Sequence, residues 1–144
     1  MGQTAVETEP AAAQWEPPPG EPRPRSRWRS RLAVSAFFVG AGVNHFAKPR
    51  FYEAIVPPSL KSQARLVVQI SGVAELIGGA GVLVPSTRRL SGFWLIALLA
   101  AVFPANLYMA REPEEFKKIP RWALYARLPL QPLCMLWVWR ATRR

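Results

Sequence analysis

The stretch Leu66–Pro85, LVVQISGVAELIGGAGVLVP, decides how this chain must fold. It is apolar on every side of a helix, yet the carboxylate of Glu75 stands at its centre. No other charged residue occurs between Arg65 and Arg88, and the next apolar interval, 90–110, has none at all. A helix that crosses a bilayer needs about 20 predominantly apolar residues, and both intervals reach that length. The pattern therefore favours a membrane protein over a soluble helical bundle.

Two more apolar segments complete the prediction. We expect membrane spans over residues 32–47, 66–84, 90–110 and 121–140, with a short interfacial helix over 49–56 that ends at Pro57 and Pro58. Internal prolines at 104, 129 and 132 predict that the third and fourth helices are kinked, because each proline removes a backbone hydrogen bond. The predicted fold class is all-α: an integral membrane four-helix bundle.

Composition separates the tails from the bundle. Residues 1–31 begin with a Pro, Ala and Glu-rich segment, predicted to be disordered, and end in an Arg cluster; residues 32–140 form the transmembrane domain, and 141–144 are a basic tail. The net charge is +10, and the basic residues flank apolar segments, as is typical of contact with anionic lipid headgroups. No nucleic-acid-binding motif is present, so we expect membrane lipid and not nucleic acid as a partner.

Polar residues inside the predicted spans gather in one half of the membrane. Alternating helices bring the ends of spans one and three beside the starts of spans two and four. We therefore predict one polar pocket, lined by Asn44, His45, Gln69, Glu75, Asn106, Arg127 and Gln131. One histidine and one cysteine supply neither a metal-ligand spacing nor an intrachain disulfide, so no metal site is predicted. No catalytic residues are identified, and we do not expect an enzyme active on its own.

A lone carboxylate at the bilayer midplane is costly, by at least ~2.5–3.5 kcal/mol, so Glu75 needs a partner. Arg127 is the only basic residue at comparable depth, and we predict that the two form an ion pair. Such a pair could be structural, or it could belong to a pocket that binds a ligand or handles protons. A neutral Glu75 hydrogen-bonded to backbone is the third alternative.

Small residues indicate which helix faces pack. Ser71, Gly72, Gly78 and Gly79 lie within one turn of Glu75, and small residues let helices approach closely in membranes. Glu75 is therefore predicted to lie on a packing face and not toward lipid. The stripe Ala36, Gly40 and Asn44 in span one shows the same spacing.

Several short segments resemble the DoxX-like family of small membrane proteins. They are His45-Phe46 followed by Pro49, Gly72 with Glu75, Pro104-Ala105-Asn106 with Met109, and Arg127-Leu128-Pro129-Leu130-Gln131. This resemblance spans residues 32–139. It implies four transmembrane helices in a bacterial inner membrane and a link to quinone-dependent redox complexes. It supplies no established catalytic residues.

The resemblance and the absence of cofactor ligands favour a non-catalytic subunit or anchor of a membrane redox complex. In that case Asn106, Gln131 or His45 could contact a quinone headgroup. The alternative is a membrane scaffold or assembly factor with no small-molecule ligand, which docks a membrane protein partner or a second copy of the chain. A small transporter is a weaker alternative, because no inverted repeat is visible.

The Arg cluster just before the first span predicts the orientation. Basic residues close to the first span are retained in the cytoplasm. We therefore expect both termini to be cytoplasmic and the polar half of the bundle to face outward.

Overall fold

The computed structural model describes residues 24–143, so the tail predicted for residues 1–22 lies outside the described part. Within that part the chain is all-helical and has no strand. Five α-helices and two short 3₁₀ helices follow one another in the order α1 (Pro24–Ala47), α2 (Pro49–Ala54), η1 (Pro58–Gln63), α3 (Ala64–Gly81), α4 (Arg88–Arg111), η2 (Pro113–Phe116) and α5 (Arg121–Thr142). The all-α prediction is confirmed, and α2 is the short helix expected after the first long one.

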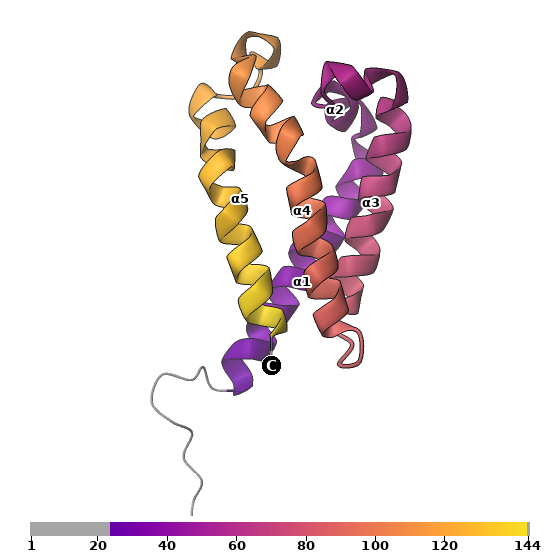
Figure 1. The fold of residues 1–144 in the computed structure, drawn as a ribbon, viewed down its shortest axis with the longest axis vertical. Helices are drawn as coiled ribbons and strands as arrows, with labels where there is room; N and C mark the ends of the chain where they lie inside the picture. The colour runs from indigo at the N-terminus through magenta and orange to yellow at the C-terminus, as the bar shows by residue number, and fades with distance from the viewer. Residues whose placement is uncertain (1–23, 144) are drawn as a thin grey trace, which may run out of the picture.

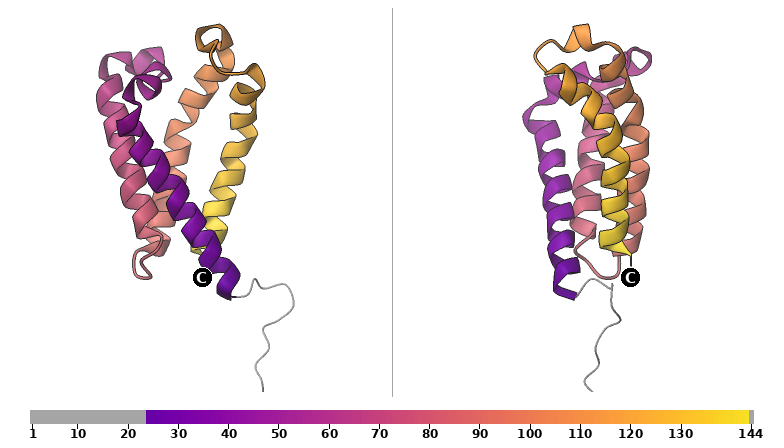
Figure 2. Two further views of the ribbon diagram at one scale, coloured as in Figure 1. Left: turned by 180° about the vertical axis from the view of Figure 1, so that it is seen from behind. Right: turned by 90° about the vertical axis from the view of Figure 1, so that its left-hand side faces the viewer.

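The four long helices run alternately up and down, as Figures 1 and 2 show. Helix α1 packs mainly on α3, and α4 packs mainly on α5. The two pairs come together at the end where the chain terminates and spread apart at the end that carries α2 and η2 (Figure 1). We call these the closed end and the open end.

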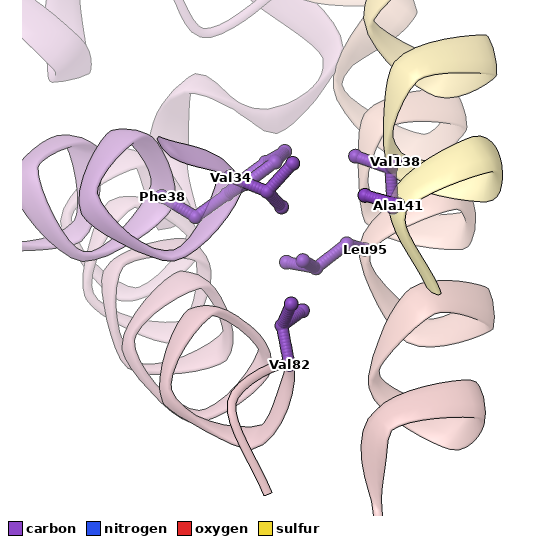
Figure 3. Close-up of a cluster of buried hydrophobic side chains, with 6 residues drawn as sticks. All are labelled: Val34, Phe38, Val82, Leu95, Val138 and Ala141. Atoms are coloured by element: carbon purple, nitrogen blue, oxygen red, sulfur yellow. The ribbon is translucent and has the colours of Figure 1, made fainter. Parts of the chain in front are cut away.

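The closed end has a core shared by all four long helices. Six side chains converge there, as Figure 3 shows: Val34, Phe38, Val82, Leu95, Val138 and Ala141. Each is at most 2% exposed. Close packing of these side chains joins the two helix pairs at this end.

At the open end each pair has its own small cluster. Val56, Ala64 and Val68 pack together beside α2 and α3. Met109, Phe116 and Leu124 pack together where η2 joins α4 to α5. Because no single core links these clusters, the open end leaves space between the pairs.

Glycines on α3 confirm the predicted packing face. A Cβ added at Gly72 would lie 2.8 Å from the Phe46 ring, and one at Gly79 would lie 3.1 Å from Phe38 Cβ, both on α1. The stripe on α1 behaves differently, because no atom lies within 4 Å of the Cβ position of Gly40. The close approach of α1 to α3 is at Gly42 instead, whose Cβ would lie 2.8 Å from the Gly72 carbonyl oxygen.

Both ends of the predicted bundle extend further than expected. Helix α1 includes the Arg-rich segment assigned to the tail, and α5 continues past Arg140 to Thr142. These turns pack on each other. Arg31 Nε donates to the Ala141 carbonyl oxygen at 3.0 Å, and Trp137 Nε1 donates to Ser30 Oγ at 3.1 Å. Mutual contact between the helix ends therefore orders residues whose composition alone is typical of tails.

Among the described helices one, Arg88–Arg111, is long and apolar enough to cross a membrane by length and composition. The expectation of four such helices is not met. The other three long helices are shorter or carry more charge. Helix α1 begins in an Arg-rich segment, α3 has only 18 residues and includes Arg65 and Glu75, and α5 contains Arg127. Helices α4 and α5 continue through their internal prolines, and the kinks stay a prediction.

Candidate functional site

A cavity of about 290 Å³ lies among the helices above the closed-end core. Most of its wall is apolar. The lining residues are Phe37, Phe38, Ala41, His45, Tyr52, Ile55, Val56, Val67, Val68, Ser71, Glu75, Leu99, Val102, Ala105, Asn106 and Arg127. Four of the seven residues predicted for a polar pocket therefore face one space: His45, Glu75, Asn106 and Arg127.

Glu75 faces this cavity with an incompletely satisfied carboxylate. Its Oε2 atom lies 3.3 Å from His45 Nδ1, and the two side chains are 12% and 10% exposed. The same Nδ1 atom lies 2.9 Å from the Ala41 carbonyl oxygen, which can only accept a hydrogen bond. The single Nδ1 proton is thus directed at Ala41. Glu75 Oε2 is left buried with no hydrogen-bond partner among the described residues.

The His45 ring is held in place by its neighbours on α1 and α2. It stacks on the Tyr52 ring with centroids 3.7 Å apart, and Asn44 Nδ2 donates to the Tyr52 hydroxyl at 2.9 Å. Asn44 therefore lies behind the cavity wall and positions Tyr52, instead of lining the pocket as predicted.

On the opposite wall, Asn106 Nδ2 donates to Gln131 Oε1 at 3.0 Å, and Gln131 Nε2 donates to the Leu99 carbonyl oxygen. Gln131 is 6% exposed, so it supports Asn106 from behind and does not reach the cavity itself. Arg127 lines the cavity, and its guanidinium lies 3.6 Å from the Met109 sulfur.

The predicted ion pair between Glu75 and Arg127 is not formed, since among the described residues it is His45 and not Arg127 that lies within 4 Å of the Glu75 carboxylate. The physical reason is the helix arrangement. The main partner of α3 is α1, whereas α5 packs on α4 and contacts α3 little. Arg127 and Glu75 therefore share a cavity without touching.

Gln69 was also predicted wrongly, because its side chain is exposed on the outside of α3. An α-helix has about 3.6 residues per turn, so Gln69, six residues before Glu75, lies on a different face. Conversely, the pocket prediction missed Tyr52 and Ser71, which line the cavity. Ser71 stands one turn before Glu75, and that spacing could have identified it.

No group of three or more metal-binding side chains lies together in residues 24–143. What the cavity offers instead is a small number of hydrogen-bonding side chains on a mostly apolar wall. Arg127 carries donors, Glu75 Oε2 an acceptor, and His45 Nε2 either role according to its protonation.

The fold and the site define an all-helical bundle protein with a mostly apolar cavity at its open end, into which a few polar side chains face. The chain belongs to a family described as a domain of unknown function (DUF8561), whose model matches residues 34–142. No curated protein and no solved structure matches the chain.

The match to this family overturns the resemblance to DoxX-like proteins, which was wrong. The segments that suggested it are short and lie far apart along the chain, so none of them is specific on its own.

Proposed function

We propose that this protein is embedded in a cell membrane. The observation that supports this is an apolar outer surface on the long helices. On α3, Leu66, Ile70, Val73 and Ile77 are 46–64% exposed and fall on one face, and Leu90 and Phe93 on α4 are 71% and 61% exposed. Soluble monomers rarely leave such large contiguous apolar patches in water. Lipid chains would cover them without cost.

Within that setting we propose that the open-end cavity binds a lipophilic molecule with a small polar head. The carrying observation is the buried Glu75 Oε2, which has no hydrogen-bond partner among the described residues and lies on the wall of a mostly apolar cavity. An unsatisfied buried acceptor costs about 1–3 kcal/mol, which a ligand hydroxyl would recover.

A quinone and its quinol are the ligand class that fits this wall. The carbonyl oxygens of a quinone accept hydrogen bonds. Arg127 has N–H groups to give, and His45 Nε2 has one when the ring is protonated. The hydroxyl of a quinol donates, and Glu75 can accept. In this proposal the protein is a binding subunit of a membrane redox complex, and the redox chemistry belongs to the ligand and its partners.

Photolabelling with a short-chain azidoquinone tests the proposal in membranes that contain the full chain. Label is expected on peptides that line the cavity. Ala105 lines the cavity, so Ala105→Phe should weaken labelling about tenfold, which corresponds to ~1.4 kcal/mol of binding. Ala100→Phe is the matched control, because Ala100 is exposed on another face of α4. Equal labelling in both variants would refute a cavity ligand.

The second candidate is a scaffold without a small-molecule ligand. The exposed face of α1 at Gly40, where nothing lies within 4 Å, favours it, because a partner helix could approach there. Co-purification of a membrane protein in a fixed ratio would test this candidate. If Ala105→Phe leaves that protein bound and Gly40→Leu releases it, the result supports this candidate over the first.

A further inference from the structure

The closed end of the molecule carries a concentration of positive charge. Arginines from the start of α1, the start of α4 and the end of α5 meet there: Arg27, Arg29, Arg31, Arg88, Arg89, Arg140 and Arg143. The glutamates within residues 24–143 are Glu53, Glu75, Glu112, Glu114 and Glu115. All of these lie at the open end or beside the cavity, so no carboxylate of the described chain neutralises the closed end.

Arg31 and Arg88 hydrogen-bond to backbone carbonyl groups. Arg31 Nε donates to the Ala141 carbonyl oxygen at 3.0 Å, and Arg88 Nε donates to the Val82 carbonyl oxygen at 3.2 Å. Both bonds satisfy backbone acceptors near the ends of helices, where intrahelical donors run out.

Arg89 and Arg143 are placed differently, because they line a groove of about 50 Å³ between α4 and α5. Its base is formed by Gly92 and Thr142, which are in direct contact. The Arg143 guanidinium lies 4.8 Å from the centre of the Trp139 ring, which holds that side chain at the groove.

Apolar surface leads directly out of this groove. Phe93 and Ile96 form its wall on α4, and Phe93 is 61% exposed. The site therefore pairs two cationic side chains with an adjoining apolar strip along a helix. That combination matches a phosphate group joined to an acyl chain.

We propose that the groove binds an anionic phospholipid, with its phosphate between Arg89 and Arg143 and an acyl chain along Phe93 and Ile96. The occupant is a lipid and not free phosphate because the apolar strip would otherwise stay uncovered. This inference rests on the membrane embedding proposed above. It is independent of the cavity ligand, which binds at the other end of the bundle.

Native mass spectrometry of the detergent-purified full chain tests the inference, with phosphatidylglycerol and phosphatidylcholine of equal chain length as probes. We expect the wild type to retain phosphatidylglycerol about tenfold better, given the attraction of each Arg for an anionic headgroup. The double variant Arg89→Gln with Arg143→Gln should lose this preference.

The matched control is Arg29→Gln with Arg140→Gln, which removes the same charge from exposed positions at the same end but outside the groove. It should keep the preference. An equal loss in both double variants would overturn the site, because general attraction to basic charge would then explain the binding.

A second measurement needs no variant. Phosphatidylglycerol should raise the thermal midpoint of the wild type, and inorganic phosphate should neither do so nor displace the lipid. Displacement by inorganic phosphate would overturn the lipid assignment. Neither lipid measurement involves the cavity at the open end. A negative result for lipid binding would therefore leave the azidoquinone labelling of the cavity unchanged, and the two proposals can be refuted separately.

Discussion

At the scale of single residues, Glu75 shows how a charge is accommodated inside an apolar helix. Its partner comes from α1, the helix that lies against it, and not from α5. The His45 ring stacks on Tyr52, and its Nδ1 atom also forms a hydrogen bond with the Ala41 carbonyl oxygen. The carboxylate is therefore positioned but only partly satisfied, which leaves it available to a ligand.

A pair of double-mutant cycles tests this arrangement through the free energy of unfolding in detergent. Side chains in contact couple by about 0.5–3 kcal/mol, so Glu75→Gln combined with His45→Gln should deviate from additivity by about 1 kcal/mol. Glu75→Gln combined with Arg127→Met should be additive within ~0.5 kcal/mol. Strong coupling to Arg127 and none to His45 would contradict the arrangement.

Gln69 and Gln131 provide a second comparison at this scale. Gln131 is buried and bonded to Asn106 and Leu99, whereas Gln69 is exposed. Gln131→Ala should lower the free energy of unfolding by about 1–3 kcal/mol, because it leaves Asn106 unsatisfied. Gln69→Ala should change it by less than ~0.5 kcal/mol. Thermal midpoints of the two variants measure the difference, and equal values would show that Gln131 is not a buried hydrogen-bonding residue.

At the scale of elements, the close contact between α1 and α3 requires glycine at position 42 but not at position 40. A Cβ at Gly42 would meet the Gly72 carbonyl oxygen at 2.8 Å and Leu76 Cγ at 2.9 Å, whereas one at Gly40 meets nothing. The two helices can lie this close only because Gly42 has no side chain.

Gly42→Ala should therefore destabilise the bundle by about 1–3 kcal/mol, the usual cost of overpacking. Gly40→Ala, the same chemical change on the same helix, should be neutral or stabilising by about 0.5–1 kcal/mol, because alanine favours helix over glycine. Thermal midpoints in one detergent compare them. A larger loss at Gly40 would mean that the stripe on the outside of α1, and not Gly42, carries helix packing.

At the scale of the whole molecule, the described chain begins and ends at the closed end, and the two helix pairs spread at the other (Figure 2). The basic closed end and the apolar sides together define how the bundle would lie in a membrane. From the Arg cluster at the start of α1 we predict that the closed end lies on the cytoplasmic side.

Accessibility labelling of introduced cysteines tests this orientation. Cys134→Ser removes the single cysteine, and Ser59→Cys and Ser86→Cys then mark the open and closed ends at exposed positions. A membrane-impermeant maleimide should label Ser86→Cys only from the cytoplasmic face and Ser59→Cys only from the opposite face. Labelling of both from one face would show that the bundle does not cross the membrane, and exchanged faces would reverse the orientation.

The sequence by itself determined the helices. Apolar length, proline and glycine positions and short polar connections act locally, so they predicted four alternating long helices, a short helix after the first, and Gly72 and Gly79 on a packing face. It also identified His45, Glu75, Asn106 and Arg127 as residues of one half of the bundle, because depth follows from counting along a helix.

Only the tertiary structure decided which of these side chains meet. Depth places two residues at one level but does not say which helices are neighbours, and the choice between His45 and Arg127 as the partner of Glu75 depended on α1 lying against α3. The cavity has the same origin: one core joins the helix pairs at the closed end and two separate clusters form at the open end. Packing between segments distant in the chain sets these contacts, and no local pattern encodes it.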